Sequence, residues 1–416
     1  MRHPDIPEWV SPETCVKCKG ARNLCGLGYC PILQKARDSF PKIEVKGKEM
    51  YGSSPPSIFV GRYGYPKVYA GPVLPPFVSK EVEVLGLSSQ LYGMGIQDII
   101  GKRSTLYRTS SVYDVRHPKE KGGVLEATQL LAMAEKPVDL EVKLVKEVKE
   151  RPSLDFFHAP LGPRTDAEKA RVTENPVVPR KVDYLVEDTD VKATEALTEL
   201  HRSGIEIDRM QNLLSAGLLG TSARRKMVPT RWSITAVDDT VGKRLMKDVR
   251  YFQEIGEYEL YENDYLGNHF LILLIPGEWG FEMMELWTKG AFWSSGDAVL
   301  TDWEPFEGRK TYADNITGGY YAARLAVLEH LYRRRRSAKV LIYREIGPEY
   351  WAPLGVWVVR ETAREAMRKK VMRFSDLDSS IKAMSERVRN PYWHQKSHTI
   401  HELRVQRRIT DYLSPP

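Results

Sequence analysis

Long apolar runs are absent from this sequence. Residues 1–7 carry charges and prolines where a signal peptide has its apolar stretch, and no later apolar run reaches the roughly 20 residues that span a membrane. The glycine-rich GxGxxG and P-loop patterns, which bind nucleotide phosphates, are absent as well. These absences predict a cytoplasmic protein with no membrane partner, and they remove two common nucleotide-binding motifs as explanations of its function.

A strong excess of one charge is also missing. The chain has 62 Lys and Arg against 55 Asp and Glu, which is a net charge of +7. This imbalance permits an anionic partner such as nucleic acid without requiring one. Basic residues concentrate in the C-terminal quarter, at residues 333–336, 364–370 and 404–408, so phosphate contacts are expected there first.

Cysteine is scarce, and all of it lies in one place. Cys15, Cys18, Cys25 and Cys30 form the spacing C-x2-C-x6-C-x4-C. Four thiolates can surround one tetrahedral zinc ion, and a cysteine pair separated by two residues reaches the metal from a single turn. The spacing therefore predicts a structural zinc site with no open position for catalysis. Two disulfides, four free thiols or an iron–sulfur cluster are the alternatives.

Residues 53–72 predict two short strands around a turn that contains glycine. Arg62 and Lys67 fall near the tip of this hairpin, with Tyr63, Tyr65 and Tyr69 close by. Basic groups bind phosphate and aromatic faces stack on bases, so Arg62 and Lys67 are candidate DNA contacts. An ordinary hairpin with half-buried tyrosines is the alternative.

A basic run, a short predicted strand and two adjacent aspartates define a second candidate site. Arg224 and Arg225 precede the strand and are candidate phosphate contacts. Asp238 and Asp239 at its end could hold Mg²⁺ or act as a general base, with Arg231 as a further catalytic candidate. Alternatively, the aspartates only cap the helix that is predicted to follow them.

The remaining segments predict a mixed α/β (α+β) protein with several domains. Helices are expected within residues 88–102 and over residues 123–134, 188–203, 210–219, 318–336 and 361–371. Strands are expected over residues 340–346 and 356–360. Residues 258–276 are expected to form a pair of strands that turns at Asn263-Asp264. Residues 158–179 are expected to form a surface loop. The aromatic-rich residues 277–293 are expected to pack in the core or to cover a pocket.

Two features of the C-terminal quarter allow more than one interpretation. The predicted helix over residues 318–336 ends in four candidate DNA-phosphate contacts, which could also be a solvated helix end: Arg333, Arg334, Arg335 and Arg336. Three histidines could hold a metal on one face of a helix, although histidines beside a basic tail are more often solvated: His394, His398 and His401.

The last eleven residues predict a docking peptide. Gln406, Ile409, Tyr412 and Leu413 reproduce the pattern that binds sliding clamps. One tight helical turn brings the three apolar side chains onto one face, where they can enter a hydrophobic pocket, while the glutamine hydrogen-bonds beside that pocket. The alternative is a frayed terminal helix that packs on its own protein.

Four features together make the chain resemble the archaeal Nre family of DNA repair proteins. They are the cysteine cluster, the segment Phe-Val-Gly-Arg-Tyr-Gly at residues 59–64, the segment at residues 227–235, and the terminal clamp motif. The resemblance covers nearly the whole chain, in the family's order of N-terminal region, C-terminal region and clamp motif. It implies a role in repairing DNA damage together with the archaeal sliding clamp PCNA. It implies no catalytic mechanism, so the catalytic and DNA-contact candidates rest on their chemistry.

The sequence therefore predicts a DNA repair factor that is recruited to DNA through PCNA, with structural Zn²⁺ in its N-terminal module. The predicted parts are a zinc-binding module at residues 1–45, an N-terminal Nre-like domain at 46–290, a C-terminal Nre-like domain at 291–400 and a PCNA-interacting tail at 401–416. The alternative function is a metal-dependent, nuclease-like enzyme that uses Asp238 and Asp239 with Mg²⁺.

Overall fold

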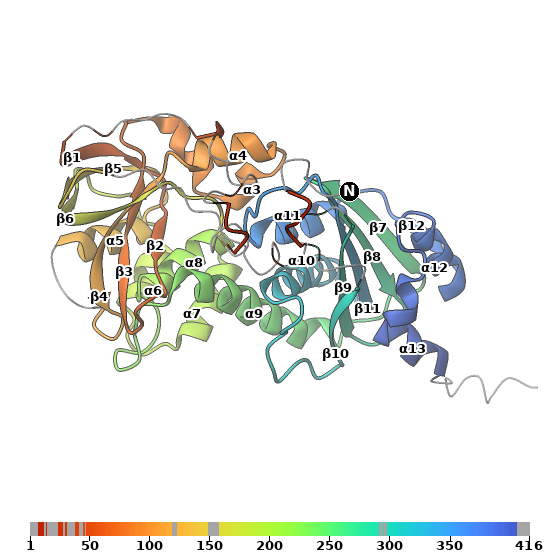
Figure 1. Cartoon of the computed structure of the whole chain (residues 1–416). Coiled ribbons are helices and arrows are strands. Elements are labelled where there is room, and N and C mark those ends of the chain that lie inside the picture. Colours follow the sequence, from red (N-terminus) through yellow and green to blue (C-terminus); the bar gives the residue numbers. More distant parts are fainter. Residues whose placement is uncertain are drawn as a thin grey trace, which may run out of the picture. The chain divides into compact units, whose positions relative to one another are not determined.

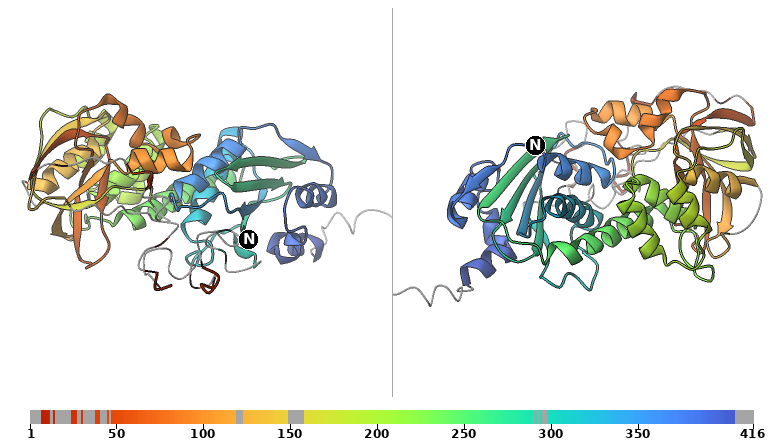
Figure 2. Two further views of the ribbon diagram at one scale, coloured as in Figure 1. Left: turned by 45° about the horizontal axis from the view of Figure 1, so that its top comes forward. Right: turned by 180° about the vertical axis from the view of Figure 1, so that it is seen from behind.

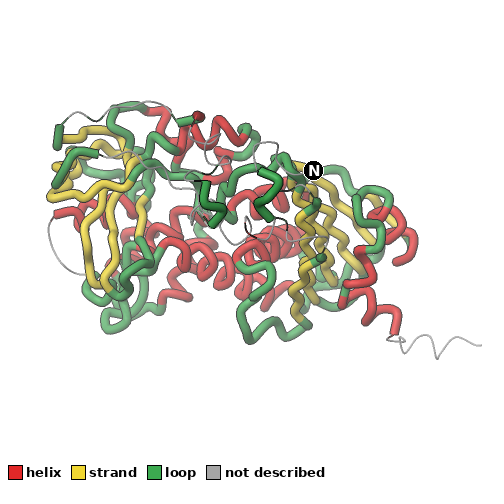
Figure 3. The backbone as a smooth tube through the Cα atoms, in the orientation of Figure 1, coloured by secondary structure: helices red, strands yellow, loops and turns green. Residues whose placement is uncertain are grey.

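A computed structural model describes most of the chain, in two compact units. The described residues are 7–11, 14, 24–27, 30, 38–40, 45, 47–118, 123–148, 158–289, 291, 294 and 298–405. The first unit comprises residues 32–244 and 352–361, and the second comprises residues 1–31, 245–351 and 362–416. Figure 1 and Figure 3 show the elements of each unit. In the described part of the chain, no helix combines the length and apolar character needed to cross a membrane.

The first unit contains a six-stranded mixed sheet. Its strands are, in spatial order, β1 (Glu49–Ser54), β5 (Val138–Leu144), β6 (Arg164–Val172), β4 (Tyr107–Asp114), β3 (Lys67–Leu74) and β2 (Ile58–Val60). β4 and β6 pair in parallel, and the other neighbours are antiparallel. Helix α5 (Gly123–Met133) contacts β2, β3, β4 and β6. Its residues Val124, Ala127 and Leu131 are buried on one face, and the helix predicted over residues 123–134 is confirmed.

Further helices pack around this sheet. They are η1 (Lys80–Leu85), α3 (Ser88–Leu91), α4 (Ile96–Arg103), α6 (Arg180–Glu187), α7 (Ala193–Arg202) and α8 (Ile207–Ser215), with the first part of α9 (Thr230–Val249). Helix α8 contacts α5, α7 and β2, so the two helices on either side of Gly204 pack against each other. Gly204 has a φ of +79°, which lets the chain leave α7 in the left-handed region.

The second unit is built on another six-stranded sheet. Its spatial order is β10 (Leu300–Glu304), β9 (Gly280–Trp287), β11 (Lys339–Ile346), β8 (Asn268–Ile275), β7 (Tyr258–Tyr265) and β12 (Met372–Phe374). Only the β9–β11 pair is parallel among these. Helix α10 (Gly318–Arg334) lies on one face, where Tyr320 meets Phe281 with ring centroids 5.0 Å apart. The helices α12 (Leu377–Ser385), η2 (Trp393–Lys396) and α13 (His398–Val405) lie on the other face (Figure 2).

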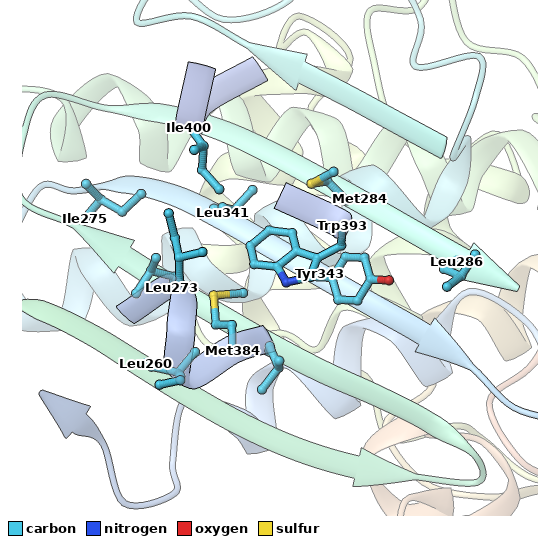
Figure 4. Packing of buried hydrophobic residues seen from close by; sticks show 13 residues of the cluster. Leu260, Leu273, Ile275, Met284, Leu286, Leu341, Tyr343, Met384, Trp393 and Ile400 are labelled. Carbon is cyan, nitrogen blue, oxygen red and sulfur yellow. The ribbon is translucent and has the colours of Figure 1, made fainter. Parts of the chain in front are cut away.

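The core of the second unit lies between its sheet and the C-terminal helices (Figure 4). Leu273 of β8 and Tyr343 of β11 point toward Met384 of α12 and Trp393 of η2. The rings of Tyr343 and Trp393 lie 5.0 Å apart, and the Trp393 side chain is fully buried. Burying a large aromatic side chain stabilises a core by a few kcal/mol, at about 25 cal/mol per Å². This packing fixes the C-terminal helices on the sheet.

Several predictions from apolar patterns are confirmed. The mixed α/β class is confirmed. The structure also confirms the hairpin at residues 53–72, the helix that ends in the arginine run, and the strand at residues 340–346. Residues 277–289 belong to the core, because Trp279 is fully buried and β9 is an interior strand. The predicted strand pair at residues 258–276 exists, but it turns at Leu266-Gly267, where both residues have positive φ, and not at Asn263-Asp264.

Three predictions about secondary structure are wrong. Residues 158–179 contain strand β6, whose inward positions Thr165, Ala167 and Ala170 are small, so no strongly apolar alternation marked the strand. Residues 356–360 begin helix α11 (Trp357–Ala366), although Val358 and Val359 favour strands. The strand expected before Asp238 is part of helix α9. Helices α9 and α11 each include residues of both units.

Candidate nucleic-acid interface

The first unit has an exposed surface of aromatic and basic side chains. It comprises Arg62, Tyr63, Tyr65, Lys67 and Trp232, and is called the Tyr65–Trp232 surface. Tyr63 is 78% exposed, while Tyr65 and Trp232 are each 45% exposed. The rings of Tyr65 and Trp232 lie 5.2 Å apart with planes inclined by 55°. Two segments that are far apart in sequence thus form one exposed aromatic pair.

Hydrogen bonds donated by backbone amides hold these segments together. The Val60 N–H donates to Thr230 Oγ1 at 2.9 Å, which joins the end of β2 to the start of α9. The Val115 N–H donates to the Pro66 carbonyl, and the Met227 N–H donates to the Val115 carbonyl, both at 2.9 Å. The hairpin loop, the chain after β4 and the approach to α9 are therefore tied to one another. This arrangement positions both rings.

The hairpin tip requires glycine at position 64. Gly64 has a φ of +83°, and a Cβ added there would lie 2.7 Å from the Lys67 carbonyl oxygen. That carbonyl belongs to the backbone and cannot move aside cheaply, so a side chain would distort the loop. Gly64 thereby keeps Tyr63 and Tyr65 on either side of the tip.

Basic residues occur in the same segments as these aromatic residues. The Arg62 guanidinium lies 4.7 Å from the centre of the Tyr63 ring and donates to its hydroxyl at 3.1 Å. Lys67 and Arg224 are exposed. Arg116 is also exposed and forms an ion pair with Asp114, whose pKa is lowered by the side-chain hydrogen bond from that arginine. Exposed rings can stack on unpaired bases while neighbouring cations meet phosphates, which is the chemistry of a single-strand contact.

Two predicted residues of this region have other surroundings. Arg225 donates to the carbonyls of Gly220 and Asp188 at 2.7 and 2.8 Å. Burial lowers the pKa of Arg225, with the charge of Asp188 opposing this shift. Arg225 therefore holds a loop together, and Arg231 is only partly exposed. Neither side chain presents its charge as openly as Arg62, Lys67 and Arg224.

Asp238 and Asp239 lie in the middle of α9 and do not cap its start. Adjacent residues on an α-helix point about 100° apart, so the two carboxylates face different surroundings. Asp238 is fully buried, whereas Asp239 lies near the surface and pairs with Lys243 at 2.7 Å. The structure therefore does not bring the two carboxylates together as a shared Mg²⁺ or general-base site, and the capping alternative is also wrong.

Asp238 belongs to a buried polar cluster, called the Arg360 cluster, formed by Arg360, Asp238, Asp208, Ser88 and Glu361. The Arg360 side chain is 1% exposed. Its Nη1 donates to Asp238 Oδ1 at 3.0 Å, its Nη2 donates to Ser88 Oγ at 3.1 Å and to Asp208 Oδ1 at 3.3 Å, and its Nε donates to Glu361 Oε1 at 3.3 Å. The cluster joins α3, α8, α9 and α11 within the first unit.

Hydrogen bonds between Ser88 and Asp208, and those of the neighbouring Arg103, satisfy further polar groups around the cluster. Ser88 donates to Asp208 Oδ2 through its hydroxyl at 2.6 Å and through its backbone N–H at 3.0 Å. Buried Arg103 donates to the carbonyls of Pro160, at 3.1 Å, and Leu85. Burial lowers the pKa of Arg103 to about 10, with the charge of Asp208 opposing the shift, so it stays cationic at neutral pH. These polar groups are partnered, which is the condition for tolerating charge in a core.

Sequence reasoning identified Asp238 but missed its partners. Asp208, Ser88 and Arg360 come from three separate parts of the chain. Arg360 directly follows the apolar run Val-Trp-Val-Val at residues 356–359, and a charged residue so close to such a run was the available signal of a buried ion pair. No pattern in the sequence pairs it with Asp238.

The predicted arginine run lies in the second unit, at the end of α10. Arg334 donates to Glu259 Oε1 at 2.9 Å and also contacts Tyr261, so it supports the sheet. Arg336 donates to Gln253 at 3.1 Å, whereas Arg333 and Arg335 are exposed. The run is therefore divided between structural and exposed guanidinium groups.

Exposed aromatic rings accompany these arginines. Tyr332 is 40% exposed with its ring 6.0 Å from Phe252, and the neighbouring Tyr251 is 77% exposed. Burial, together with the charges of Arg334 and Arg333, lowers the pKa of nearby His330 to about 4. His330 is therefore neutral at physiological pH and adds no positive charge. The exposed positive charge at this end of α10 therefore comes from Arg333 and Arg335.

A groove of the second unit also contains basic residues. Lys369, Lys370, Arg387 and Arg389 line it, but four carboxylates do so as well: Glu262, Asp264, Glu345 and Glu349. These opposite charges balance, so the groove is less suited to a polyanion than the arginine run is.

The candidate metal ligands are only partly described. Cys25 and Cys30 are half-buried, while Cys15 and Cys18 lie outside the described residues. Within the described ranges, no three His, Cys, Asp or Glu side chains gather in a way that could hold a metal ion. The clamp-binding residues Gln406, Ile409, Tyr412 and Leu413 also lie outside the described residues.

The three histidines of the C-terminal quarter do not share one helix. His394 lies in η2, whereas His398 and His401 lie in α13, which begins after Ser397. The ring of His398 stacks on Trp303 with centroids 3.6 Å apart and planes inclined by 8°. The expectation of a common helical face is therefore wrong, because the chain breaks its helix between the first histidine and the second.

Comparison with known proteins places the chain in a family. The model of the archaeal Nre N-terminal region matches residues 24–294, and the model of the archaeal Nre C-terminal region matches residues 304–412. Together they cover nearly all of the chain, which belongs to the archaeal Nre family. No solved structure matches the chain significantly.

Individual relatives agree with this assignment. The chain is 39% identical over 380 residues to the DNA repair protein NreA of Archaeoglobus fulgidus, covering 91% of this chain and 95% of the relative. It is 36% identical over 370 residues to the DNA repair protein NreB of the same organism, covering 88% and 91%. It is 36% identical over 372 residues to the DNA repair protein NreA of Haloferax volcanii, covering 86% and 87%.

Proposed function

We propose that this protein is a DNA repair factor that binds DNA through exposed aromatic and basic side chains and is recruited by the sliding clamp PCNA. The observation that carries the proposal is the similarity, over 86–91% of the chain, to relatives that are named DNA repair proteins. A protein in that role has to hold DNA, and the Tyr65–Trp232 surface has the chemistry to do so.

The mode of binding follows from the side chains. Tyr65 and Trp232 are exposed and adjacent, so unpaired bases can stack on them without a rearrangement of the core. Lys67, Arg62 and Arg224 supply cations for the phosphates beside those bases. Arg333 and Arg335 offer a second basic contact in the other unit. Stacking depends little on base identity, so we expect binding with weak sequence preference.

Replacing Trp232 by alanine tests this mode. Removing an aromatic stacking partner costs about 1–3 kcal/mol per base, so affinity for single-stranded DNA should fall roughly five- to 150-fold. Fluorescence anisotropy with a labelled oligonucleotide measures the change. Lys67→Ala should weaken binding more evenly across sequences and lower the slope of log K against log salt by about one.

An exposed tyrosine elsewhere in the first unit is the matched control. Tyr184 of α6 is 62% exposed and lies outside the Tyr65–Trp232 surface. Tyr184→Ala should leave affinity unchanged. Equal affinities for wild type, Trp232→Ala and Tyr184→Ala would show that the Tyr65–Trp232 surface does not bind DNA.

The zinc site is a further part of the proposal. It is supported by the four clustered cysteines of the sequence, and a closed tetrathiolate site would stabilise the N-terminal module without catalysing a reaction. Metal analysis of protein purified under reducing conditions should find about one zinc per chain. Cys18→Ser should lower both the zinc content and the protease resistance of the N-terminus, whereas metal-free wild-type protein would contradict the assignment.

The clamp-binding tail completes the proposal. It is supported by the spacing of Gln406, Ile409, Tyr412 and Leu413, and the match to the Nre C-terminal model extends to residue 412. A short peptide that enters a pocket of the clamp would bring the DNA-binding surfaces to replicating or damaged DNA. An adaptor of this kind requires no catalytic group, which agrees with the buried, partnered state of Asp238.

A further inference from the structure

The first unit contains a pocket that shares chain segments with the Tyr65–Trp232 surface. Phe59 of β2 lines the pocket, and β2 leads into the hairpin loop that carries Tyr63 and Tyr65. Thr230 and Ile234 of α9 also line it, two residues on either side of the exposed Trp232. Residues of α3, α4, α8 and α11 complete the walls. The same segments of the chain therefore carry the pocket and the surface where we expect DNA bases to stack.

One buried amide in this pocket has no partner. Gln211 of α8 is 8% exposed and lines the pocket, and its Nε2 makes no hydrogen bond to any residue that the structure describes. Leaving a buried polar group without a partner costs about 1–3 kcal/mol. The groups of the adjacent Arg360 cluster are hydrogen-bonded, so this exception points to a ligand that supplies the missing partner.

The chemistry of the walls limits the ligand. A glutamine side chain offers a hydrogen-bond donor and an acceptor side by side. This pair matches the edge of a heteroaromatic ring on which an acceptor lies beside a donor. Phe59 and Trp357 provide aromatic surface, and the Phe59 ring is held edge-to-face against His158 at 5.2 Å. The two lining arginines, Arg103 and Arg360, already donate within the protein. A neutral planar heteroaromatic ring fits these groups better than a phosphate does.

The volume agrees with the inserted edge of one planar base. The pocket has a volume of about 80 Å³. One water requires roughly 10–15 Å³ on this scale, so the pocket has room for several waters or, in their place, for the edge of one planar base. A nucleotide strand would have to remain outside, on the Tyr65–Trp232 surface.

We propose that this pocket binds one unstacked nucleobase of the DNA, read by Gln211 and covered by Phe59 and Trp357. The inference rests on the proposed function and deepens it, because it assigns a substrate group to one pocket. Extrusion of a base costs least where pairing is already lost, as at a bulge or a damaged site. The pocket would therefore give a DNA repair factor a preference for disturbed duplexes.

A duplex that carries 2-aminopurine as a single-nucleotide bulge tests the inference, with a fully paired duplex of the same sequence as reference. The full-length protein should bind the bulged duplex at least tenfold more tightly than the paired one. The fluorescence of the bulged 2-aminopurine should change on binding, and acrylamide should quench it less in the complex. An unchanged fluorescence that acrylamide quenches equally in the free and bound duplex would overturn the proposal.

Gln211→Met is the informative variant. Methionine has a similar shape, and its introduction removes a buried amide without a partner, so the fold should be at least as stable. The preference for the bulged duplex should fall roughly tenfold, because the hydrogen bonds to the base are lost. Ser110→Ala is the matched control, since Ser110 Oγ is also buried without a partner among the described residues but does not line the pocket.

The outcomes separate this inference from the proposed function. If Trp232→Ala weakens binding of both duplexes but Gln211→Met keeps the wild-type preference, the pocket proposal fails and the DNA-binding proposal stands. If wild-type protein binds neither of these duplexes nor the single-stranded oligonucleotide, the proposed DNA-binding function itself fails. If Gln211→Met unfolds the protein, the acrylamide measurement on wild type still decides.

Discussion

Asp238→Ala is expected to lower the free energy of unfolding of the first unit by about 3–5 kcal/mol. The substitution removes the carboxylate that accepts from Arg360 Nη1 at 3.0 Å while leaving the guanidinium in a place where it is 1% exposed. Asp208 and Glu361 still contact the guanidinium, each at 3.3 Å, but its closest carboxylate is lost and no water can replace it without opening the core. The alanine also leaves a cavity in the middle of α9, which adds to the loss.

Asp239→Ala is the matched control for this variant. Asp239 is the next residue in the chain, but it lies near the surface and its pair with Lys243 is partly exposed. Such a pair contributes at most about 1 kcal/mol. Hydrogen exchange of amides in α9 and α11 measures both variants without assuming that the two units unfold together. Equal effects of the two substitutions would contradict the importance of the Arg360 cluster.

The variant Asp238→Ala with Arg360→Met extends this test. Because the two side chains interact directly, the double substitution should cost less than the sum of the two single substitutions. Asp208 and Glu361 would lose a donor in the double variant, so recovery should be incomplete. A loss of DNA binding or turnover in Asp238→Ala alone therefore does not identify a catalytic carboxylate, unless the stability of the first unit is shown to be unchanged.

Tyr412→Ala is expected to reduce clamp binding roughly thirtyfold, which corresponds to about 2 kcal/mol for the loss of an aromatic anchor. In the proposed helical turn, Tyr412 and Leu413 would be buried in the clamp, Ile409 would make a third apolar contact, and Gln406 would orient the peptide. Since these residues follow α13, which ends at Val405, the fold and the zinc content should be unaffected.

Isothermal titration calorimetry with the cognate clamp measures this effect. Thr410→Ala is the matched control, because position 410 lies between the anchor positions and should tolerate the change. Deletion of residues 406–416 should remove binding altogether. If the deletion variant still bound the clamp with wild-type affinity, the tail could not be the clamp-binding motif.

Local patterns in the sequence predicted much of the secondary structure. The helix at residues 123–134 and the strand at 340–346 were readable because apolar residues recur with the period of one element and favour it by propensity. The hairpin at residues 53–72 was readable from its glycine and proline positions. In α9, however, Ile234, Thr235 and Val237 suggested a strand, although Ile234, Val237 and Val241 follow the spacing of a helix. Burial along one side of a long helix outweighed β-branched propensity.

The sequence by itself also determined the candidate DNA contacts at the hairpin and the family, because both depend on short continuous segments. Only the tertiary structure placed Trp232 against Tyr65 and Asp238 against Arg360, and showed that Gln211 lacks a partner in a pocket. Each of these relations joins residues far apart in the chain. Such pairs form because several elements must bury their apolar faces together, and no local pattern specifies which distant side chains then meet.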